Sequence, residues 1–446
     1  MKENTHHLLR HIMKPLSKFL NAKVASSILL LLAAVIAFIW ANSSHYESYN
    51  ALWDIPIAFN IGGFGISNSL GLWINDALMA IFFFVIGLEI KRELLVGELS
   101  SIQKAALPAI AALGGMVFPA LIYLAFNHGS PGVMGWGIPM ATDIAFALAC
   151  LLALGSAIPL SLKVFLMALA IFDDMGAVLV IAVFYTEHIN LISLGLGIVI
   201  LAVSTFLNIK GVRKTYPYVF LGIALWMAFF LSGVHATIAG VLLAFTIPAR
   251  SFSSQAQFKA ESRSIIQSFP DKDFHIMITD ETQRRMMQQL EATLNNLNSP
   301  LQRIEDKIYP FVNYFVLPIF ALANAGVNIS QGSFVNNLTS PIFIGVAAGL
   351  FIGKPLGITL SSWLSVKLRL AQLPTGVKWN QMFAVSCLGG IGFTMSLFIT
   401  NLAFTDPLFI AQAKLAIISG SILSATLGIT LFVILKHRNK KRLIDD

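Results

Sequence analysis

Twelve long runs of apolar residues constrain the fold of this chain more than any other feature. Most are long enough for a helix to cross the hydrocarbon core of a bilayer. Inside lipid, backbone polar groups must pair within the protein, which favours helices, and the alternating pattern of a membrane β-barrel is absent. The sequence predicts an all-α integral membrane protein with transmembrane helices at residues 24–40, 72–90, 105–126, 136–154, 164–185, 191–207, 217–231, 234–247, 311–325, 341–366, 382–404 and 415–435.

The basic residues predict how these spans are oriented. All 30 lysines and arginines except Lys354 and Lys414 fall in the N-terminal segment, in alternate loops, or in the C-terminal tail KHRNKKR. Basic loops stay in the cytoplasm, so both termini are predicted to be cytoplasmic. The same argument divides 217–247 into two spans with a turn at Gly233. Topology and anionic lipid then explain the net charge of +8, and nucleic acid is not expected as a partner.

The chain is predicted to have five parts along its length. The one long polar stretch should form a cytoplasmic loop in which Pro300, after Ser299, begins a helix. Cys150 and Cys387 fall inside spans and are expected to pack there, with no disulfide, resident metal or cofactor. The parts are a basic N-terminal cytoplasmic segment (1–23), spans 1–8 (24–247), the polar loop (248–310), spans 9–12 (311–435) and a basic tail (436–446).

Five ionisable residues lie inside the predicted spans: Asp76, Asp143, Asp173, Asp174 and Lys354. Because burying a charge in lipid is costly, each is a candidate functional residue, although Asp76, near the outer end of its span, can equally be a local cap. Adjacent residues on a helix point about 100° apart. One member of the Asp173–Asp174 pair can therefore pair with a neighbouring helix while the other faces a cavity.

Two spans should be interrupted. GWGIPMATDIAFAL (135–148) carries two glycines and a proline before Thr142 and Asp143, and SCLGGIGFTMSLFI (386–399) carries three glycines before Thr394. Glycine and proline weaken a helix interior. Paired interruptions in corresponding halves are typical of transporters built from inverted repeats, which would here be spans 3–5 and 10–12.

The interruptions and the buried charges together predict a cation site. A broken helix exposes partial charges at its inner ends, which Asp143 and Lys354 can balance. Unwound carbonyls and Asp174 offer hard oxygen ligands, which suit Na⁺. Protons compete for the same oxygens. A secondary active transporter exchanging Na⁺ for H⁺ by alternating access is therefore expected, rather than an enzyme.

A symporter, a channel and an intramembrane protease are the competing functions. A cation-coupled symporter on a similar scaffold remains the alternative. A channel needs no titratable pair beside a membrane lysine, which argues against it. An intramembrane aspartyl protease needs two aspartates on different helices, one in a GxGD setting, and that motif does not occur.

The sequence resembles the NhaA family of bacterial sodium–proton antiporters. This family is one of the transporter families in which the inverted-repeat pattern is known, so that pattern and the resemblance are not independent. The likeness covers most of the chain outside 1–23 and 251–299. It implies an electrogenic Na⁺(Li⁺)/H⁺ antiporter of the bacterial inner membrane that serves sodium and pH homeostasis. The stretches that carry it are FFFVIGLEIKRELLVGELS, IPMATDIAFALA, LKVFLMALAIFDDMGAVL, SGVHATIAGV, LPIFALANAGV, LFIGKPLGI and GGIGFTMSLFI.

The resemblance also implies roles for single residues. Asp174 matches the carboxylate that binds sodium, and Asp173 matches its neighbour, which takes part in proton exchange and can pair with the membrane lysine, here Lys354. Thr142 and Asp143 match the pair at the broken fourth span. The residues matched to the response to pH are Glu89, Arg92, Glu93, His235 and Glu305.

One stretch departs from the family pattern. Before span 9 the resemblance implies a glutamate followed by histidines, whereas QRIEDKIYP keeps Glu305 and has no histidine. The pH threshold of the family's transport activity, and its steepness, therefore cannot be assigned to this chain from the resemblance.

A small outer β-hairpin is predicted at 56–67. In IPIAFNIGGFGISNS, apolar residues alternate with others on both sides of Gly62-Gly63, and a tight hairpin turn needs positive φ. An isolated hairpin is marginal in water and offers unpaired edges to another chain. A homodimer through this hairpin is expected, and the resemblance implies the same.

Overall fold

The computed structural model describes residues 25–61, 64–155, 158–186, 189–251, 254–269, 281–328 and 337–445. The chain is predominantly helical and divides into two compact units. The first contains Met1–Phe82, Glu93–His188 and Val312–Asp446, and the second contains Phe83–Arg92 and Ile189–Phe311. Helix α4 (Met79–Val96) contributes residues to both.

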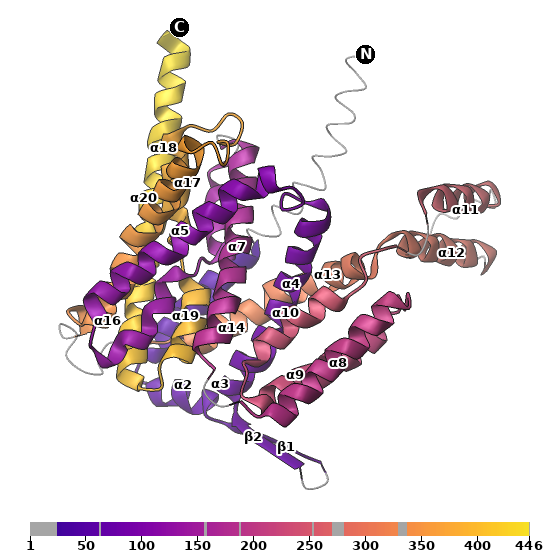
Figure 1. Ribbon diagram of the computed structural model, residues 1–446, viewed down its shortest axis with the longest axis horizontal. Helices are drawn as coiled ribbons and strands as arrows, with labels where there is room; N and C mark the ends of the chain where they lie inside the picture. The colour runs from indigo at the N-terminus through magenta and orange to yellow at the C-terminus, as the bar shows by residue number, and fades with distance from the viewer. Residues whose placement is uncertain are drawn as a thin grey trace. The chain divides into compact units, whose positions relative to one another are not determined.

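The first unit holds the interrupted helices and the only sheet among the described residues (Figure 1). Its elements in chain order are the helix Ala25–Ala41, α2 (Tyr46–Trp53), β1 (Pro56–Ile61), β2 (Phe64–Ser69), α3 (Leu70–Trp73), η1 (Ile74–Leu78), α5 (Ile102–Asn127), η2 (Pro131–Met140), α6 (Ile144–Ala153), α7 (Leu160–Phe184), η4 (Val312–Val316), α14 (Leu317–Asn324), α16 (Pro341–Ala348), η5 (Gly349–Gly353), α17 (Lys354–Lys367), α18 (Trp379–Gly389), α19 (Phe393–Ala403) and α20 (Pro407–Asp445).

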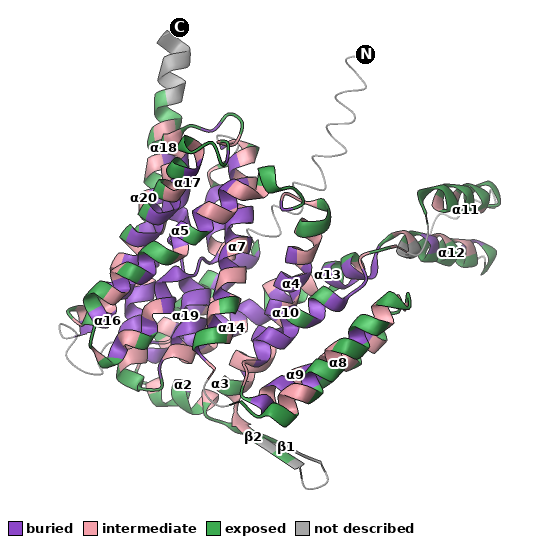
Figure 2. Ribbon diagram, viewed as in Figure 1, coloured by how far each residue is buried: buried purple, intermediate pink, exposed green. Residues whose placement is uncertain are grey.

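The core of the first unit is built by α5, α7, α17 and α18, whose inward faces are buried (Figure 2). Helices α5 and α17 approach closely because glycines face each other. A Cβ added at Gly114 would lie 2.4 Å from the Gly357 carbonyl oxygen. Larger side chains here would push the two helices apart, and α17 is the helix that begins at Lys354.

The second unit consists of α8 (Leu191–Ile209), α9 (Tyr216–Ser232), α10 (Ala236–Thr246), α11 (Gln255–Gln267), α12 (Glu281–Leu297) and α13 (Pro300–Phe311) with part of α4. Helices α8 and α9 lie side by side (Figure 1). Gly233 ends α9 at φ 81°, in the left-handed region that glycine adopts without strain, which confirms the predicted turn. Helix α13 begins at Pro300 as predicted, and Ser299 caps it by accepting a hydrogen bond from Gln302 N at 3.2 Å.

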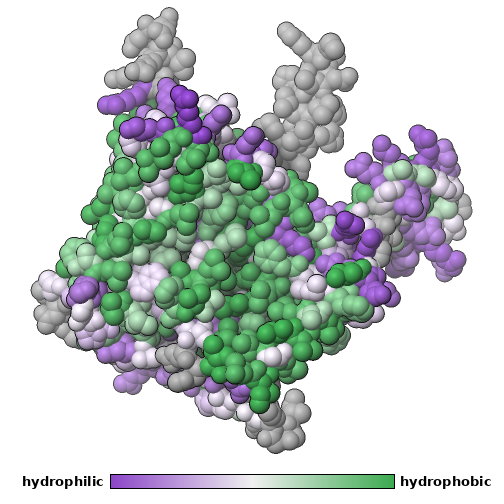
Figure 3. Space-filling model, viewed as in Figure 1, coloured by the Kyte–Doolittle hydropathy of each residue, from purple (hydrophilic) through white to green (hydrophobic). Residues whose placement is uncertain are grey.

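Helices of membrane-spanning length account for part of the predicted topology. Among the described residues, six helices are long and apolar enough to cross a bilayer, and up to nine if each bent pair is one span. Large apolar side chains lie exposed on them, including Leu121 on α5 and Ile192 on α8. Figure 3 shows hydrophobic residues over much of the visible face. Helices α9, α10 and α14 coincide with predicted spans but, with 17, 11 and 8 residues, are shorter than the six spanning helices, so the number twelve stays a prediction.

Both predicted interruptions are confirmed. Helices η2 and α6 meet at an angle of 40°, and α18 and α19 meet at 45°. Three segments (η1, η4 and η5) are π-helical turns inside longer helices, and such turns often occur at functional sites. Segment η5 ends immediately before Lys354.

The predicted hairpin is also confirmed. Strands β1 and β2 are antiparallel, with Pro56 opposite Ser69 and Ile61 opposite Phe64. The turn at Gly62-Gly63 lies outside the described residues, as do the N-terminal segment 1–24 and Asp446.

Candidate functional site

A buried ion pair lies at the centre of the candidate site. Lys354 at the start of α17 donates a hydrogen bond to Oδ2 of Asp173, which lies in the middle of α7. Lys354 is 0% exposed, and Asp173 and its neighbour Asp174 are each 1% exposed. Lys354 also interacts electrostatically with Asp174. One cation therefore faces two carboxylates where water is excluded, and Asp173 is the member that pairs with another helix.

Thr142 connects this ion pair to both interrupted spans. It lies in the unwound link between η2 and α6, with its Oγ1 2.6 Å from Asp173 Oδ2 and 2.8 Å from the carbonyl oxygen of Gly389, at the end of α18. A hydroxyl has one hydrogen, so it can donate to the carboxylate or to the carbonyl. A proton or cation on Asp173 would therefore change which oxygen Thr142 donates to.

Asp143 joins the starts of α6 and α19, the two half-helices that follow the breaks. Its Oδ1 accepts from Phe146 N at 3.1 Å, which caps α6, and its Oδ2 accepts from Thr394 N at 3.0 Å and from the Thr394 hydroxyl. A carboxylate at helix starts offsets the partial positive charge there. Asp143 thus contacts both helix starts, and its part in ion exchange stays a prediction.

Lys354 is also predicted to balance the facing helix ends, and this stays a prediction; the hydrogen bond that the structure gives it goes to Asp173. The physical reason for this bond is that a full carboxylate charge attracts an ammonium more strongly than the partial charge of a helix end. The end of α18 is reached by Thr142.

Sequence reasoning did not name Thr394 as a site residue. The available signal was a hydroxyl placed directly after the glycines that break span 11, matching Thr142 after the break in span 4. Asp76, the other acidic residue of the predicted spans, is partly exposed and lies in the π-turn η1, whereas Lys354 bonds to Asp173.

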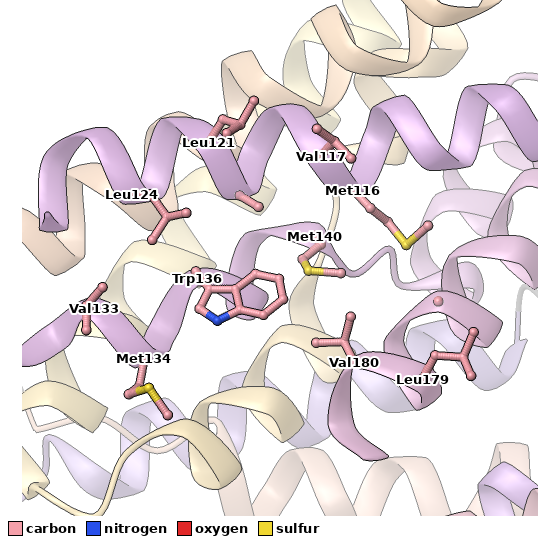
Figure 4. A pocket seen from close by; sticks show the side chains of 12 residues that line it. Met116, Val117, Leu121, Leu124, Val133, Met134, Trp136, Met140, Leu179 and Val180 are labelled. Carbon is pink, nitrogen blue, oxygen red and sulfur yellow. The ribbon is translucent and has the colours of Figure 1, made fainter. Parts of the chain in front are cut away.

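A groove of about 640 Å³ lies next to α7, the helix that carries Asp173 (Figure 4). Helix α5, η2 and α7 line it with apolar side chains that include Leu121, Trp136, Met140 and Leu179. Met140 shortly precedes Thr142, so this wall is close to the unwound link in sequence. Because the residues lining it carry no charge, the groove offers no ligand to an ion.

A second pocket, of about 440 Å³, has both charged and apolar walls. It is lined by the beginnings of α5 and α7 and by the loop 372–375, with an ion pair of 3.8 Å between Lys104 and Glu98. Its lining includes Ala168, about one and a half turns before Asp173 on α7. The charged residues at this pocket distinguish it from the apolar groove.

The second unit brings together three of the residues matched to the pH response. Arg92 pairs with Glu305 of α13, and its Nη2 lies 3.7 Å from Glu89 Oε1. Glu305 is 7% exposed. Burial raises the pKa of Glu305 to about 7, while the Arg92 charge lowers it by a smaller amount and the Glu89 charge raises it. The carboxyl group therefore titrates near neutral pH.

Glu93 and His235 are the other two residues matched to the pH response. Glu93 belongs to the first unit, where its carboxylate accepts from Glu98 N at 3.0 Å. His235 precedes the start of α10, whereas Lys91, next to Arg92, donates to the Phe245 carbonyl at the other end of that helix. A helix length therefore separates His235 from the cluster.

Comparison with known proteins agrees with this geometry. The family model described as Na+/H+ antiporter 1 matches residues 17–432. The chain is 46% identical over 434 residues to the Na(+)/H(+) antiporter NhaA of Oleidesulfovibrio alaskensis, covering 97% of this chain and 96% of that protein.

Two other relatives give the same result. The antiporter NhaA of Acidithiobacillus ferrooxidans is 46% identical over 422 residues (94% of this chain, 97% of that one), and that of Escherichia coli O9:H4 is 46% identical over 420 residues (93% and 97%). Both the model and these relatives span nearly the full length of the chain. The chain therefore belongs to the NhaA family of sodium–proton antiporters, and it is a multi-pass membrane transporter.

Proposed function

We propose that this chain exchanges Na⁺ or Li⁺ for H⁺ by alternating access, with both ions competing for Asp173 and Asp174. The observation that carries the proposal is the buried Asp173–Lys354 ion pair beside Asp174, next to two interrupted helices. A structural ion pair would not need a second adjacent carboxylate at the same depth, because an extra buried charge destabilises the fold.

The residues of the site have separate tasks in this exchange. Asp174 and Asp173 supply the carboxylate oxygens for the cation. Thr142 and the Gly389 carbonyl lie within hydrogen-bonding distance of each other and supply further neutral oxygens. Asp143 holds the starts of α6 and α19 together and so positions the unwound links rather than binding the cargo.

The proton balance makes the exchange electrogenic. With protons bound, Asp174 is neutral and Lys354 is charged against Asp173. When Na⁺ binds both carboxylates, Asp174 releases its proton, and Lys354, having lost its counter-ion in apolar surroundings, releases another. Two protons then move one way for each Na⁺ moving the other way, and one net charge crosses the membrane.

The cluster of Glu89, Arg92 and Glu305 is proposed to tune the exchange to pH. A carboxyl group with a pKa of about 7 changes its charge between acid and alkaline cytoplasm, and its ion pair with Arg92 changes with it. Glu93 and His235 remain candidates for the same response through the family resemblance. Sodium and pH homeostasis at a bacterial inner membrane, with both termini in the cytoplasm, is the corresponding cellular role.

The test is proton movement in proteoliposomes that contain the purified protein, followed by a pH-sensitive dye. Addition of Na⁺ or Li⁺ should drive protons across the membrane, whereas K⁺ should not. The apparent Na⁺ affinity should rise with pH until the carboxylates are ionised, because protons and Na⁺ bind the same oxygens. An affinity independent of pH would exclude shared binding.

The same vesicles separate antiport from the alternative, a cation-coupled symporter. An inward Na⁺ gradient should move protons outward in an antiporter, and it should move no proton outward in a sodium-coupled symporter. A membrane potential should change the rate if the exchange is electrogenic.

A further inference from the structure

Three asparagine side chains form a hydrogen-bonded chain across three helical segments of the first unit. Asn401 Nδ2 donates to Asn324 Oδ1 at 2.6 Å, and Asn324 Nδ2 donates to Asn75 Oδ1 at 2.8 Å. Asn401 lies on α19, Asn324 ends α14, and Asn75 lies in the π-turn η1. The amide chain therefore fastens one half of an interrupted span to two other spans.

The central amide has a fixed orientation. The Nδ2 group of Asn324 also donates to the carbonyl oxygen of Phe320, at 2.9 Å. Rotating the amide by half a turn would place two oxygens against each other. Both hydrogens of Asn324 thus have acceptors and its oxygen has a donor. Asn324 is 4% exposed, so water does not readily replace either partner.

Helix α19 connects this amide chain with the ion site. Thr394, in the first turn of α19, holds Asp143, and Asn401 lies about two turns, or roughly 10 Å, further along the same helix. Ser396 between them donates to the carbonyl oxygen of Ile138 in η2, at 2.8 Å. A shift of α19 at Asn401 is therefore transmitted to the unwound links.

The amide chain crosses the boundary at which movement is expected. Helix α19 belongs to the predicted repeat of spans 10–12, whereas α14 and η1 belong to spans 9 and 2, outside both repeats. Transporters with inverted repeats change access largely by rocking one bundle against another. A hydrogen bond across that boundary holds one of the two arrangements and is broken in the other.

We propose that Asn75, Asn324 and Asn401 form a latch that holds α19 against α14 and η1 in the conformation described here and opens when the ion site turns to the outer face. The latch rests on the proposed function, because it requires two access states. Its three residues are positioning residues, which act on Asp143 through α19 and touch no ion.

Two variants weaken the latch by different amounts. Asn324→Leu removes both hydrogen bonds between helices, and Asn401→Leu removes one. The matched control is Asn127→Leu. Asn127 Nδ2 donates to Tyr123 O, four residues earlier in its helix, and to Pro341 O on another helix, so the same kinds of bond are lost. Those bonds join α5 to α16, which both lie inside the predicted repeats.

The readout is access to a single cysteine at position 141, beside Thr142. In a protein with Cys150→Ser and Cys387→Ser, the substitution Ala141→Cys places a thiol at a residue that is 2% exposed. A membrane-impermeant maleimide is added to right-side-out and to inside-out vesicles, and labelling rates are compared. Asn75 and Asn324 each lie near one end of a predicted span. The charges of the loops assign that end to the outer side of the membrane.

Asn324→Leu should raise the labelling rate from the outside about tenfold and lower it from the inside. Tenfold corresponds to ~1.4 kcal/mol, a change of the size expected when two interhelical hydrogen bonds in a membrane protein are lost. Asn401→Leu should give a smaller change in the same direction. Asn127→Leu should not raise the outer labelling rate while lowering the inner one.

Equal increases from both sides would indicate loosened packing and overturn the latch, as would unchanged rates in both latch variants. If Asn324→Leu does not fold, Asn401→Leu alone decides between these outcomes. Failure of the proposed function is seen separately, as absence of sodium-driven proton movement by the unmodified protein.

Discussion

Asp143 accepts a hydrogen bond at 3.0 Å from the backbone N–H of Thr394, although 251 residues separate the two in the chain. Each residue lies at the start of the helix that follows a break, Asp143 before α6 and Thr394 in the first turn of α19. One carboxylate therefore stabilises two helix starts at once. The two breaks are held in register by this contact, and the ion pair of Lys354 and Asp173 lies beside them.

The hydroxyl of Thr394 is predicted to stabilise this contact. Thr394→Val keeps the shape of the side chain and the backbone donor but removes the hydroxyl donor to a buried carboxylate, which should lower the free energy of unfolding by about 1–3 kcal/mol. Thr394→Ser keeps the hydroxyl and is the control. Thermal unfolding in mild detergent measures both, and equal transition temperatures for the two variants would contradict the role of the hydroxyl.

Much of this site was predictable from the sequence because its signals are strong. Carboxylates and a lysine inside apolar runs are conspicuous, and glycines with a proline mark the breaks. The spacing could not show that Thr394 meets Asp143 or that Asn324 lies between Asn75 and Asn401. Neutral hydroxyls and amides are common in spans, and their partners are distant in sequence, so only the packing of the helices reveals them.

Replacing either carboxylate of the Asp173–Asp174 pair should abolish transport, but only the replacement of Asp173 should strongly destabilise the protein. Asp174→Asn and Asp173→Asn should both abolish sodium-dependent proton movement. Asp173→Asn should in addition destabilise the protein by about 3 kcal/mol, because it leaves the Lys354 ammonium without its hydrogen-bonded carboxylate. The exposed Asp306→Asn serves as the control for both measurements.

A double-variant cycle tests the pairing itself. If Asp173 and Lys354 stabilise each other, Lys354→Ala should cost less stability in the Asp173→Asn background than in the unmodified protein. Additive losses in thermal unfolding would contradict the pairing. Full proton movement by vesicles that contain Asp174→Asn would exclude this residue from cation binding.

Glu305 should make the stability of the protein fall as pH rises through the neutral range. Burial raises the pKa of this carboxyl from its ordinary value of 4.5 to about 7, so the folded chain holds a proton that the unfolded chain releases. The resulting stabilisation is fully present below about pH 4.5 and is lost as the pH rises to about 7. Glu305→Gln should flatten the stability curve in this window, and Glu291→Gln, at an exposed position, should not.

Unfolding temperatures at several pH values between 5 and 8 distinguish these outcomes. If the cluster also tunes transport, the pH dependence of exchange by Glu305→Gln should shift while its maximal rate is retained. A parallel pH dependence of stability in the unmodified protein and in Glu305→Gln would show that this carboxyl does not titrate between those limits.

The β1–β2 hairpin is predicted to join two copies of the chain. The described sheet has two strands, so each strand has one edge whose backbone groups are not paired in the sheet. Such edges can bind a strand of another chain. Deleting residues 56–67 should give monomers with the ion site intact, because Asp173 and Lys354 belong to distant elements. The deletion can close without strain, since Leu70 N already bonds to Ile55 O at 2.9 Å. Light scattering in mild detergent measures the mass, and proteoliposomes measure exchange. A deleted protein that remained dimeric would place the main contact elsewhere, and a monomer without exchange would show that each copy depends on the other.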